Sequence, residues 1–465
     1  MRLITFQNAT FLLQGKPILS KLTFEIRKRE HLLISGDNGS GKTTFCRALA
    51  RKLRTASGQA TFTNLDFGDI QMITFTDAGS LFHSVNNLHY YQQRFNSWDS
   101  DGHLTMRDYL KAKGINTNDK KSMKLFAQLK IDCLIDRERI KLSSGQTRKM
   151  LLASAILRAP KVLILDNAYI GLDGTGRRVL NHFLDDLVKL VDLTLIISGQ
   201  ATDLPKCIKK ELRMSCGQIE SFKPISSVAT TNSTEFENDT KKVGKKPNTV
   251  DVCLSMKNIN VAYKGESVLS NLSWEVKNGE RWVVTGHNGS GKSTLVSLIY
   301  ADHPQLYSQD IKIMGLRPGR GVSIWDIKKR IGFTSPELHA YVKTGLTCSQ
   351  VVATGLWDKL ELMGDMSSDQ VNRIDEMLNW FELKHLSQTP YQFVSTGEQC
   401  ICLFLRALIK HPPILLLDEP FQGLDNHNIE IAKNILREKF KEQTLLFISH
   451  HVHEYPENIN GILEL

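Results

Sequence analysis

Long apolar runs are missing from this chain of 465 residues. No stretch reaches the roughly 18 apolar residues that a membrane-crossing helix needs, so a helical membrane-spanning protein is excluded. The first residues, MRLITF, enter an alternating strand-like pattern and lack the apolar stretch of a secretory signal. We therefore expect a cytoplasmic protein.

Clustered cysteines are also missing. The eight cysteines include no C-x-x-C pair, which excludes the usual zinc and iron–sulfur patterns, and reduced thiols in the cores are expected. The composition is otherwise globular, with 41% hydrophobic and 23% charged residues. The formal net charge of +10 is compatible with a nucleic acid partner, an anionic membrane surface or a basic cytoplasmic protein. Charge alone does not choose among these.

What the chain does have is an internal repeat. The stretch GDNGSGKTT recurs as GHNGSGKST, SSGQ has its counterpart in STGE, and VLILDNAYIGLD recurs as ILLLDEPFQGLD. Lys42 and Lys292 are 250 residues apart, and Asp166 and Asp418 are 252 apart. Motifs that keep register over such a distance indicate a tandem duplication.

A polar segment separates the two copies. Residues 224–250 are rich in Ser, Thr, Asn and Lys and contain few large apolar residues, which is typical of a flexible linker. As a coil, these residues would span roughly 29 Å, enough for two domains to meet face to face. We predict a first domain at 1–223, the linker at 224–250 and a second domain at 251–465.

Each copy contains a phosphate-binding loop of the form G-x-x-x-x-G-K-[ST], with an apolar strand-like run before it and a helical pattern after it. Glycines let backbone N–H groups surround phosphates, and the lysine reaches the β and γ phosphates. The predicted ATP-binding residues of these loops are Gly36, Asn38, Gly39, Ser40, Gly41, Lys42, Thr43 and Thr44, and Gly286, Asn288, Gly289, Ser290, Gly291, Lys292, Ser293 and Thr294. Two such loops in register predict an α/β fold with two P-loop NTPase domains.

Acidic residues end the apolar run of each copy. Asp166 and Asp418 close continuous hydrophobic stretches, which are typical of buried parallel strands. A carboxylate at such a strand end suits the shell of Mg²⁺, together with the hydroxyl of Thr43 or Ser293. Glu419, next to Asp418, is placed to polarise a water molecule as a general base.

The segments around SSGQ and STGE resemble the signature turn of ATP-binding cassettes. Taken alone, each serine is also a good helix N-cap. The resemblance implies that each turn completes the partner domain's ATP site, through the residues Ser143, Gly145, Gln146, Ser395 and Gly397. It also implies an antiparallel β subdomain and a helical subdomain beside each parallel-sheet core.

The same resemblance implies a switch histidine at His450 and an adenine-stacking aromatic ring at Tyr263. In the first half these positions differ: Asn167 stands where the second half has Glu419, and Gly199 is aligned with His450. Leu13 aligns with Tyr263, and the nearby Phe11 could replace the ring. We predict that the second half hydrolyses ATP and that the first half binds ATP but turns it over slowly.

Cassette proteins place a glutamine between their sheet and helical subdomain, and its counterpart in this sequence is harder to identify. In the first half Gln93 is the best candidate for this further metal-site residue, and Gln92 is the next. In the second half Ile331–Glu337 contains no glutamine. The coupling of the second site to a partner is therefore not expected to follow the family pattern in full.

The entire chain resembles the fused tandem cassettes of the ModF/PhrA type, which are molybdenum-transport or photorepair ATP-binding proteins. The resemblance rests on SNLSWEV, ADHPQLYSQD and SIWDIKKRIGF in the second half. It implies ATP and Mg²⁺ as cofactors and separately encoded membrane permease subunits as partners, with the protein peripheral at the inner face of the membrane. An ATPase acting on ribosomes, nucleic acid or regulation stays open, as does a first half that serves only as a scaffold.

Overall fold

The computed structural model describes most of both halves of the chain. The described residues are 1–13, 16–74, 105–129, 131–137, 144–169, 174–199, 204–225, 252–263, 266–287, 289–319, 321–343 and 345–465. Three predicted site residues, Gln93, Ser143 and Asn288, lie outside these ranges. The predicted linker lies outside them too, apart from its first two residues, 224 and 225.

The first half contains an antiparallel sheet and a mainly parallel one. The antiparallel sheet has the order β2-β1-β4, and the other has the order β5-β6-β7-β3-β8-β9, in which only the β8–β9 pair is antiparallel. Its elements are β1 (Arg2–Leu13), β2 (Lys16–Arg27), β3 (Leu32–Ser35), α1 (Lys42–Leu49), β4 (Thr55–Phe62), β5 (Ile70–Thr74), α2 (Met106–Ala112), α3 (Lys120–Leu129), α4 (Ser144–Ile156), β6 (Val162–Asp166), α5 (Gly174–Leu190), β7 (Thr194–Ser198), β8 (Lys210–Ser215) and β9 (Gln218–Pro224).

The second half repeats this plan. Its antiparallel sheet has the order β11-β10-β13, and its parallel sheet has the order β14-β15-β16-β12-β17. Its elements are β10 (Val252–Tyr263), β11 (Glu266–Lys277), β12 (Arg281–Thr285), α6 (Lys292–Ile299), β13 (Asp310–Ile313), α7 (Ile324–Lys328), β14 (Ile331–Thr334), α8 (Cys348–Ala353), α9 (Ser368–Asn379), α10 (Thr396–Leu408), β15 (Ile414–Asp418), α11 (Asn426–Glu438), β16 (Thr444–Ile448) and β17 (Gly461–Glu464).

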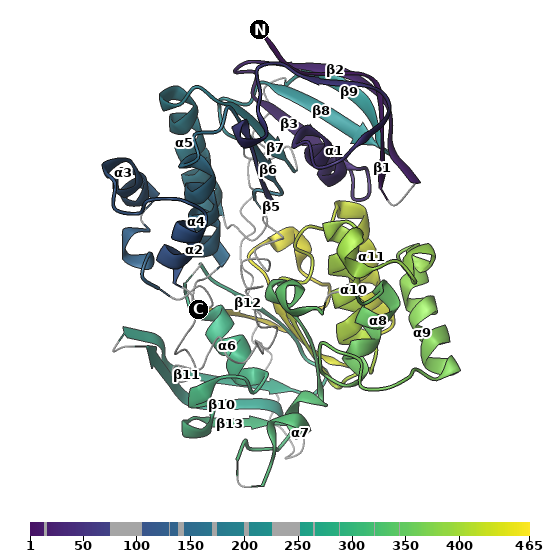
Figure 1. The fold of residues 1–465 in the computed structure, drawn as a ribbon. Helices are drawn as coiled ribbons and strands as arrows, with labels where there is room; N and C mark the ends of the chain where they lie inside the picture. Colours follow the sequence, from purple (N-terminus) through teal and green to yellow (C-terminus); the bar gives the residue numbers. More distant parts are fainter. Residues whose placement is uncertain are drawn as a thin grey trace.

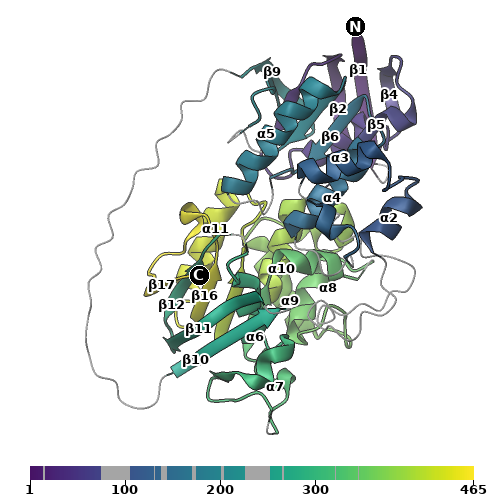
Figure 2. The same ribbon diagram turned by 90° about the vertical axis from the view of Figure 1, so that its left-hand side faces the viewer.

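The predicted fold class is confirmed. Both halves have a parallel core, an antiparallel sheet and a group of helices, α2 and α3 in the first half and α8 and α9 in the second (Figure 1). The two antiparallel sheets lie at opposite ends of the molecule, and the parallel cores lie between them (Figures 1 and 2).

The sheet of the first half is buried on both faces, as the sequence pattern predicts. Leu163 and Leu165 of β6 belong to one core cluster, with α4 and α5, whereas Val162 and Ile164 belong to the other, with α1 and the antiparallel sheet. Successive side chains of a strand point to opposite faces, so each strand contributes to both cores. A strand enclosed in this way is continuously hydrophobic until the residue at which it leaves the core.

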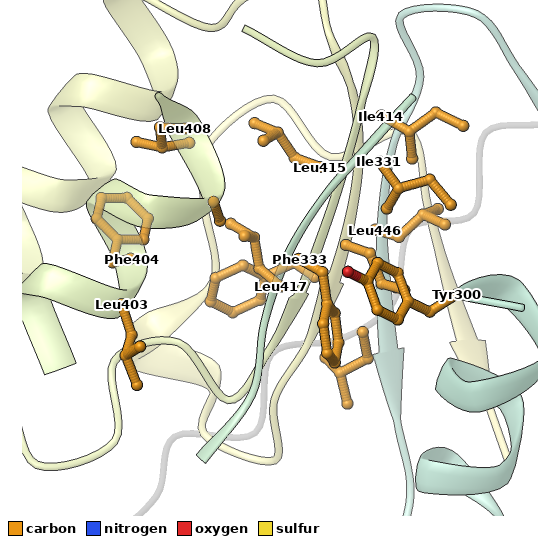
Figure 3. Close-up of a cluster of buried hydrophobic side chains, with 14 of the residues drawn as sticks. Tyr300, Ile331, Phe333, Leu403, Phe404, Leu408, Ile414, Leu415, Leu417 and Leu446 are labelled. Carbon is orange, nitrogen blue, oxygen red and sulfur yellow. The ribbon is translucent and has the colours of Figure 1, made fainter. Parts of the chain in front are cut away.

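The core of the second half joins its parallel sheet to the helix that follows the signature turn. Leu403, Phe404 and Leu408 of α10 lie beside Leu415 and Leu417 of β15 (Figure 3). The ring of Tyr300 stacks on Phe333 of β14, with 4.2 Å between centroids and 28° between planes. This packing holds the start of α10 and the ends of β14 and β15 in fixed relative positions.

Candidate functional site

Each phosphate loop connects a central strand to a helix. The first loop joins β3 to α1 and the second joins β12 to α6, and the helices begin at Lys42 and Lys292. The N-cap residues Gly41 and Gly291 have φ angles of 98° and 102°, in the left-handed region that favours glycine. The predicted strand–loop–helix context is therefore present twice.

The loops fit the phosphates of a nucleotide. A Cβ atom on Gly36 would lie 2.3 Å from the carbonyl oxygen of Met214, so the loop backbone must stay free of side chains there. The hydroxyls of Ser40 and Ser290 are buried and have no hydrogen-bond partner among the described residues. Backbone N–H groups at a helix start, with such hydroxyls, form an anion site.

The two loop lysines hold their ammonium groups inside the loops. Lys42 Nζ donates to the carbonyl oxygens of Gly36 and Asp37, at 2.7 Å each. Lys292 Nζ donates to the carbonyl oxygens of Gly286 and His287, at 2.6 and 3.0 Å. The charged groups thus lie where an incoming phosphate can take over their hydrogen bonds.

Asp166 ends β6 beside the first loop and is fully buried. Burial raises the pKa of its carboxyl group, while hydrogen bonds with Ser198 and Thr43 and the charges of Arg47 and Lys42 act in the opposite direction. Burial likewise lowers the pKa of Lys42, against the charge of Asp166. The predicted pair of Thr43 and Asp166 is therefore in contact.

The second half places Glu419 directly after Asp418, at the end of β15. Glu419 has a φ angle of 42°, and its Oε1 lies 2.9 Å from Nδ1 of His450, the second residue after β16. The two predicted catalytic residues therefore lie together, although they are 31 positions apart in the chain. Asn167 has a similar backbone, with a φ angle of 55°, but its amide cannot accept a proton as a carboxylate can.

Sequence reasoning missed Gln422. Its Nε2 donates to Oε2 of Glu419 at 2.7 Å, so the carboxylate is bonded on one oxygen by His450 and on the other by Gln422. A signal was available, because the first half has Ile170 at the equivalent position, where Asn167 has replaced the glutamate. The amide is present only in the half that has the carboxylate.

We expect Gln422→Leu to lower kcat about tenfold and leave KM for ATP nearly unchanged. The substitution removes a hydrogen bond to a charged group, which contributes about 1.5–3 kcal/mol. Steady-state phosphate release measures the effect. Gln422→His is the matched control because it retains an N–H donor and should recover part of the rate. A Leu variant as fast as the parent protein would show that Gln422 does not position Glu419.

The first phosphate loop contacts the second domain. The backbone N–H of Asn38 donates to Asp425 at 3.0 Å, and its side-chain amide donates to the carbonyl oxygen of Gly423 at 3.2 Å. A Cβ atom on Gly397 would lie 2.3 Å from Nδ2 of Asn38. The signature turn of the second half thus lies against the phosphate loop of the first, with α1 facing α10 and α11 (Figure 1).

Ser395 has the capping role that its sequence context predicts. It is the N-cap of α10, accepts from the backbone N–H of Glu398 at 3.3 Å, and donates its own backbone N–H to that side chain at 2.6 Å. The cap therefore positions the helix whose second residue, Gly397, contacts the other domain. Capping and an interdomain role are compatible here.

The reciprocal arrangement brings the start of α4 toward Glu419. Gly145 and Gln146 lie in the first turn of α4. Arg148, two residues further along the helix, is buried, with 8% of its surface exposed. Burial lowers the pKa of Arg148 to about 10, and the charge of Glu419 opposes that shift. A cavity of about 620 Å³ between the domains is lined by residues of both, including Lys42, Asn167 and Glu419.

Tyr263 lies at the end of β10 and is 40% exposed. Its hydroxyl is 2.7 Å from Nε2 of His303, whose pKa burial lowers to about 4. Since Nδ1 of that neutral ring accepts from the backbone N–H of Gln305, Nε2 carries the proton and donates to Tyr263. The exposed ring remains a predicted adenine contact.

Two sequence interpretations need correction. Phe11 cannot replace Tyr263, because it is 1% exposed and packs on Phe6 in the core. Gly199 is not the equivalent of His450 either: the backbone N–H of Gly199 bonds to β3 as that of Ser449 bonds to β12. The equivalent residue is therefore Gln200, which lies outside the described residues. β7 and β16 end at equivalent residues, Ser198 and Ile448, so the equivalent of His450 is the second residue after β7.

The first phosphate loop lies against the signature turn of the second half, and the second half contains a loop of the same form. The profile of the ABC transporter family matches residues 19–169 and 269–422. The chain belongs to the ABC transporter family. It is accordingly an ATP-binding ATPase with two tandem domains.

Relatives share this tandem organisation over most of their length. An uncharacterized ABC transporter ATP-binding protein of Schizosaccharomyces pombe is 32% identical, covering 98% of this chain and 96% of the relative. The ABC transporter ATP-binding protein ModF of Escherichia coli is 31% identical, covering 92% and 90%. An uncharacterized ABC transporter ATP-binding protein of Saccharomyces cerevisiae is 29% identical, covering 72% and 70%. The predicted resemblance to ModF is confirmed.

The described part of this ABC protein has neither a helix that could span a membrane nor a cluster of side chains that could ligate a metal by itself. Within the described ranges, no helix combines the length and apolar character needed to cross a bilayer. The same part of the chain contains no group of three or more His, Cys, Asp or Glu residues that could hold a metal ion by itself.

Proposed function

We propose that this ABC protein hydrolyses ATP mainly at the phosphate loop of its second domain. The observation that carries the proposal is the bonded group of Glu419, His450 and Gln422 beside Asp418. The first domain has Asn167 in place of the glutamate. Lys292, Ser293 and the signature turn Ser143–Gln146 of the first domain would complete the hydrolytic site.

The chain's own residues account for the steps at that site. The loop N–H groups and Lys292 bind the phosphates, and Glu419 takes the proton of the attacking water. His450, in contact with Glu419 at 2.9 Å, orients the carboxylate, and Gln422 holds its other oxygen. Ser293 and Asp418 would supply hard oxygen ligands for Mg²⁺, which when bound would neutralise charge on the phosphates.

The first-domain site is proposed to bind ATP and turn it over slowly. Lys42, Thr43 and Asp166 are in place there, and Asn38 already contacts Gly423 and Asp425 of the other domain. ATP at this site would lie between the first phosphate loop and Ser395–Gly397. It would thereby hold the domains together while the second site completes its cycle.

We further propose that the protein energises a membrane transporter with separately encoded permease subunits. Relatives over most of the chain's length are ABC transporter ATP-binding proteins. The resemblance to the ModF/PhrA type implies a molybdate-type anion as the substrate. The basic charge of +10 favours the alternative, an ATPase acting on ribosomes or nucleic acid.

Affinity purification of the Glu419→Gln variant in ATP separates these functions, because slowed hydrolysis should hold the closed complex. Recovery of a membrane permease, absent from a parallel Lys292→Ala purification, is the expected result. Recovery of ribosomal subunits or nucleic acid in the same comparison would overturn the transport proposal and support the alternative.

A further inference from the structure

Ser335 is a buried serine whose hydroxyl is not hydrogen-bonded to any described part of the chain. It follows β14 and occupies the N-cap of the 3-10 helix Pro336–Tyr341, with 3% of its surface exposed. A serine at this position usually accepts a hydrogen bond from the helix start, but Ser335 makes no such bond. Among the described residues its Oγ atom has no hydrogen-bond partner at all. Burying a hydroxyl in this way is unfavourable unless something else bonds it.

The strand register places Ser335 beside the acidic end of β15. β14 and β15 are parallel neighbours, and Thr334 pairs with Leu417, so the next pair along the sheet is Ser335 and Asp418. Figure 3 shows the preceding residues of β14, Ile331 and Phe333, next to the side chains of β15. Paired residues of adjacent parallel strands lie about 4.8 Å apart and point to the same face.

The first domain has a hydroxyl at the same place. Thr74, the last residue of β5, pairs directly with Asp166. Asp166 and Asp418 are equivalent residues, so their neighbours on the adjacent strands, Thr74 and Ser335, are equivalent too. Both domains therefore place a hydroxyl group next to the carboxylate that ends the neighbouring strand, which is Asp166 in the first domain and Asp418 in the second. A serine that served only as a helix cap would need neither this strand register nor a buried hydroxyl that makes no hydrogen bond within the described residues.

We propose that Ser335 is an oxygen donor for the divalent cation that accompanies ATP at the second-domain site. Asp418 and Ser293 offer two hard oxygen groups there, and a hydroxyl at the adjacent strand end adds a third, directly or through one water molecule. The segment Ile331–Glu337 contains no glutamine. The polar side chain of this segment that is in register with Asp418 is that of Ser335. The inference rests on the proposed nucleotide site of the second domain.

Manganese provides a readout other than activity. In a Lys42→Ala background, which weakens the first site, Mn²⁺ binding to the complex with a non-hydrolysable ATP analogue can be followed by electron paramagnetic resonance. We expect Ser335→Ala to weaken Mn²⁺ binding about tenfold, the loss typical when a supporting group of a metal site is removed. Ser335→Thr retains the hydroxyl and should bind Mn²⁺ within a few-fold of the background protein.

The nucleotide affinity measured in EDTA serves as the control for folding. Ser335→Ala should leave it unchanged, because the lysine and the loop N–H groups do not depend on the hydroxyl. Equal Mn²⁺ affinity in Ser335→Ala and in the background protein would overturn the inference. Absence of any Mn²⁺–nucleotide complex in the background protein itself would instead overturn the proposed second-domain site.

Discussion

Glu419→Gln is expected to lower ATP turnover by about 10²- to 10⁴-fold, the usual loss when a general base is removed. The amide retains the shape of the side chain and can still contact His450, which lies 2.9 Å from the carboxylate. It cannot accept a proton from water. ATP affinity should therefore change little, while steady-state phosphate release falls nearly to zero.

The first domain contains the matched control. Asn167 occupies the equivalent position and has the same left-handed backbone, so Asn167→Ala should leave total turnover unchanged within error. Glu419→Gln with a large residual rate would contradict the assignment of hydrolysis to the second domain. A large loss in Asn167→Ala would do so as well, since it would show that the first site contributes to turnover.

Lys292→Ala is expected to reduce turnover by about 10²- to 10³-fold, a loss typical of removing one charged or polar group aimed at the reacting centre. Lys292 is 9% exposed and holds its ammonium on the carbonyl oxygens of Gly286 and His287. Those bonds would be exchanged for bonds to phosphate when ATP binds. Without the ammonium, the second loop has no side-chain cation of its own for the β and γ phosphates.

Equilibrium binding to the Lys292→Ala variant also decides what the first domain does. One ATP should still bind, because Lys42 has the same pair of loop carbonyl contacts in the first domain. Adding Lys42→Ala should abolish that remaining binding. A Lys292→Ala protein that binds no nucleotide would show that the first domain is only a scaffold.

Local motifs by themselves determine the phosphate loops, the buried strands and the repeat. Each depends on a short stretch of chain, such as the glycines before Lys42 or the apolar run before Asp418, and short-range geometry follows directly from residue type. The interdomain pairing is predicted only through the resemblance to cassettes. The contacts of Asn38 with Gly423 and Asp425 give that pairing a physical basis.

Three features were decided by tertiary structure because they depend on which strands are neighbours and where each strand ends. The register of β7 moved the equivalent of His450 from Gly199 to Gln200. Packing of β1 buried Phe11 in the core, where it cannot meet a nucleotide.

The third concerns the second-domain site itself, where the chain's folding brought Gln422 onto Glu419 and placed Ser335 beside Asp418. From sequence alone this half lacked an expected glutamine, and the contrast of Gln422 with Ile170 could not show that the amide meets Glu419. Residue type determined that the chain contains two copies of one phosphate-binding loop. Only the parallel strand register, which sets distant residues side by side, decided which side chains surround each copy.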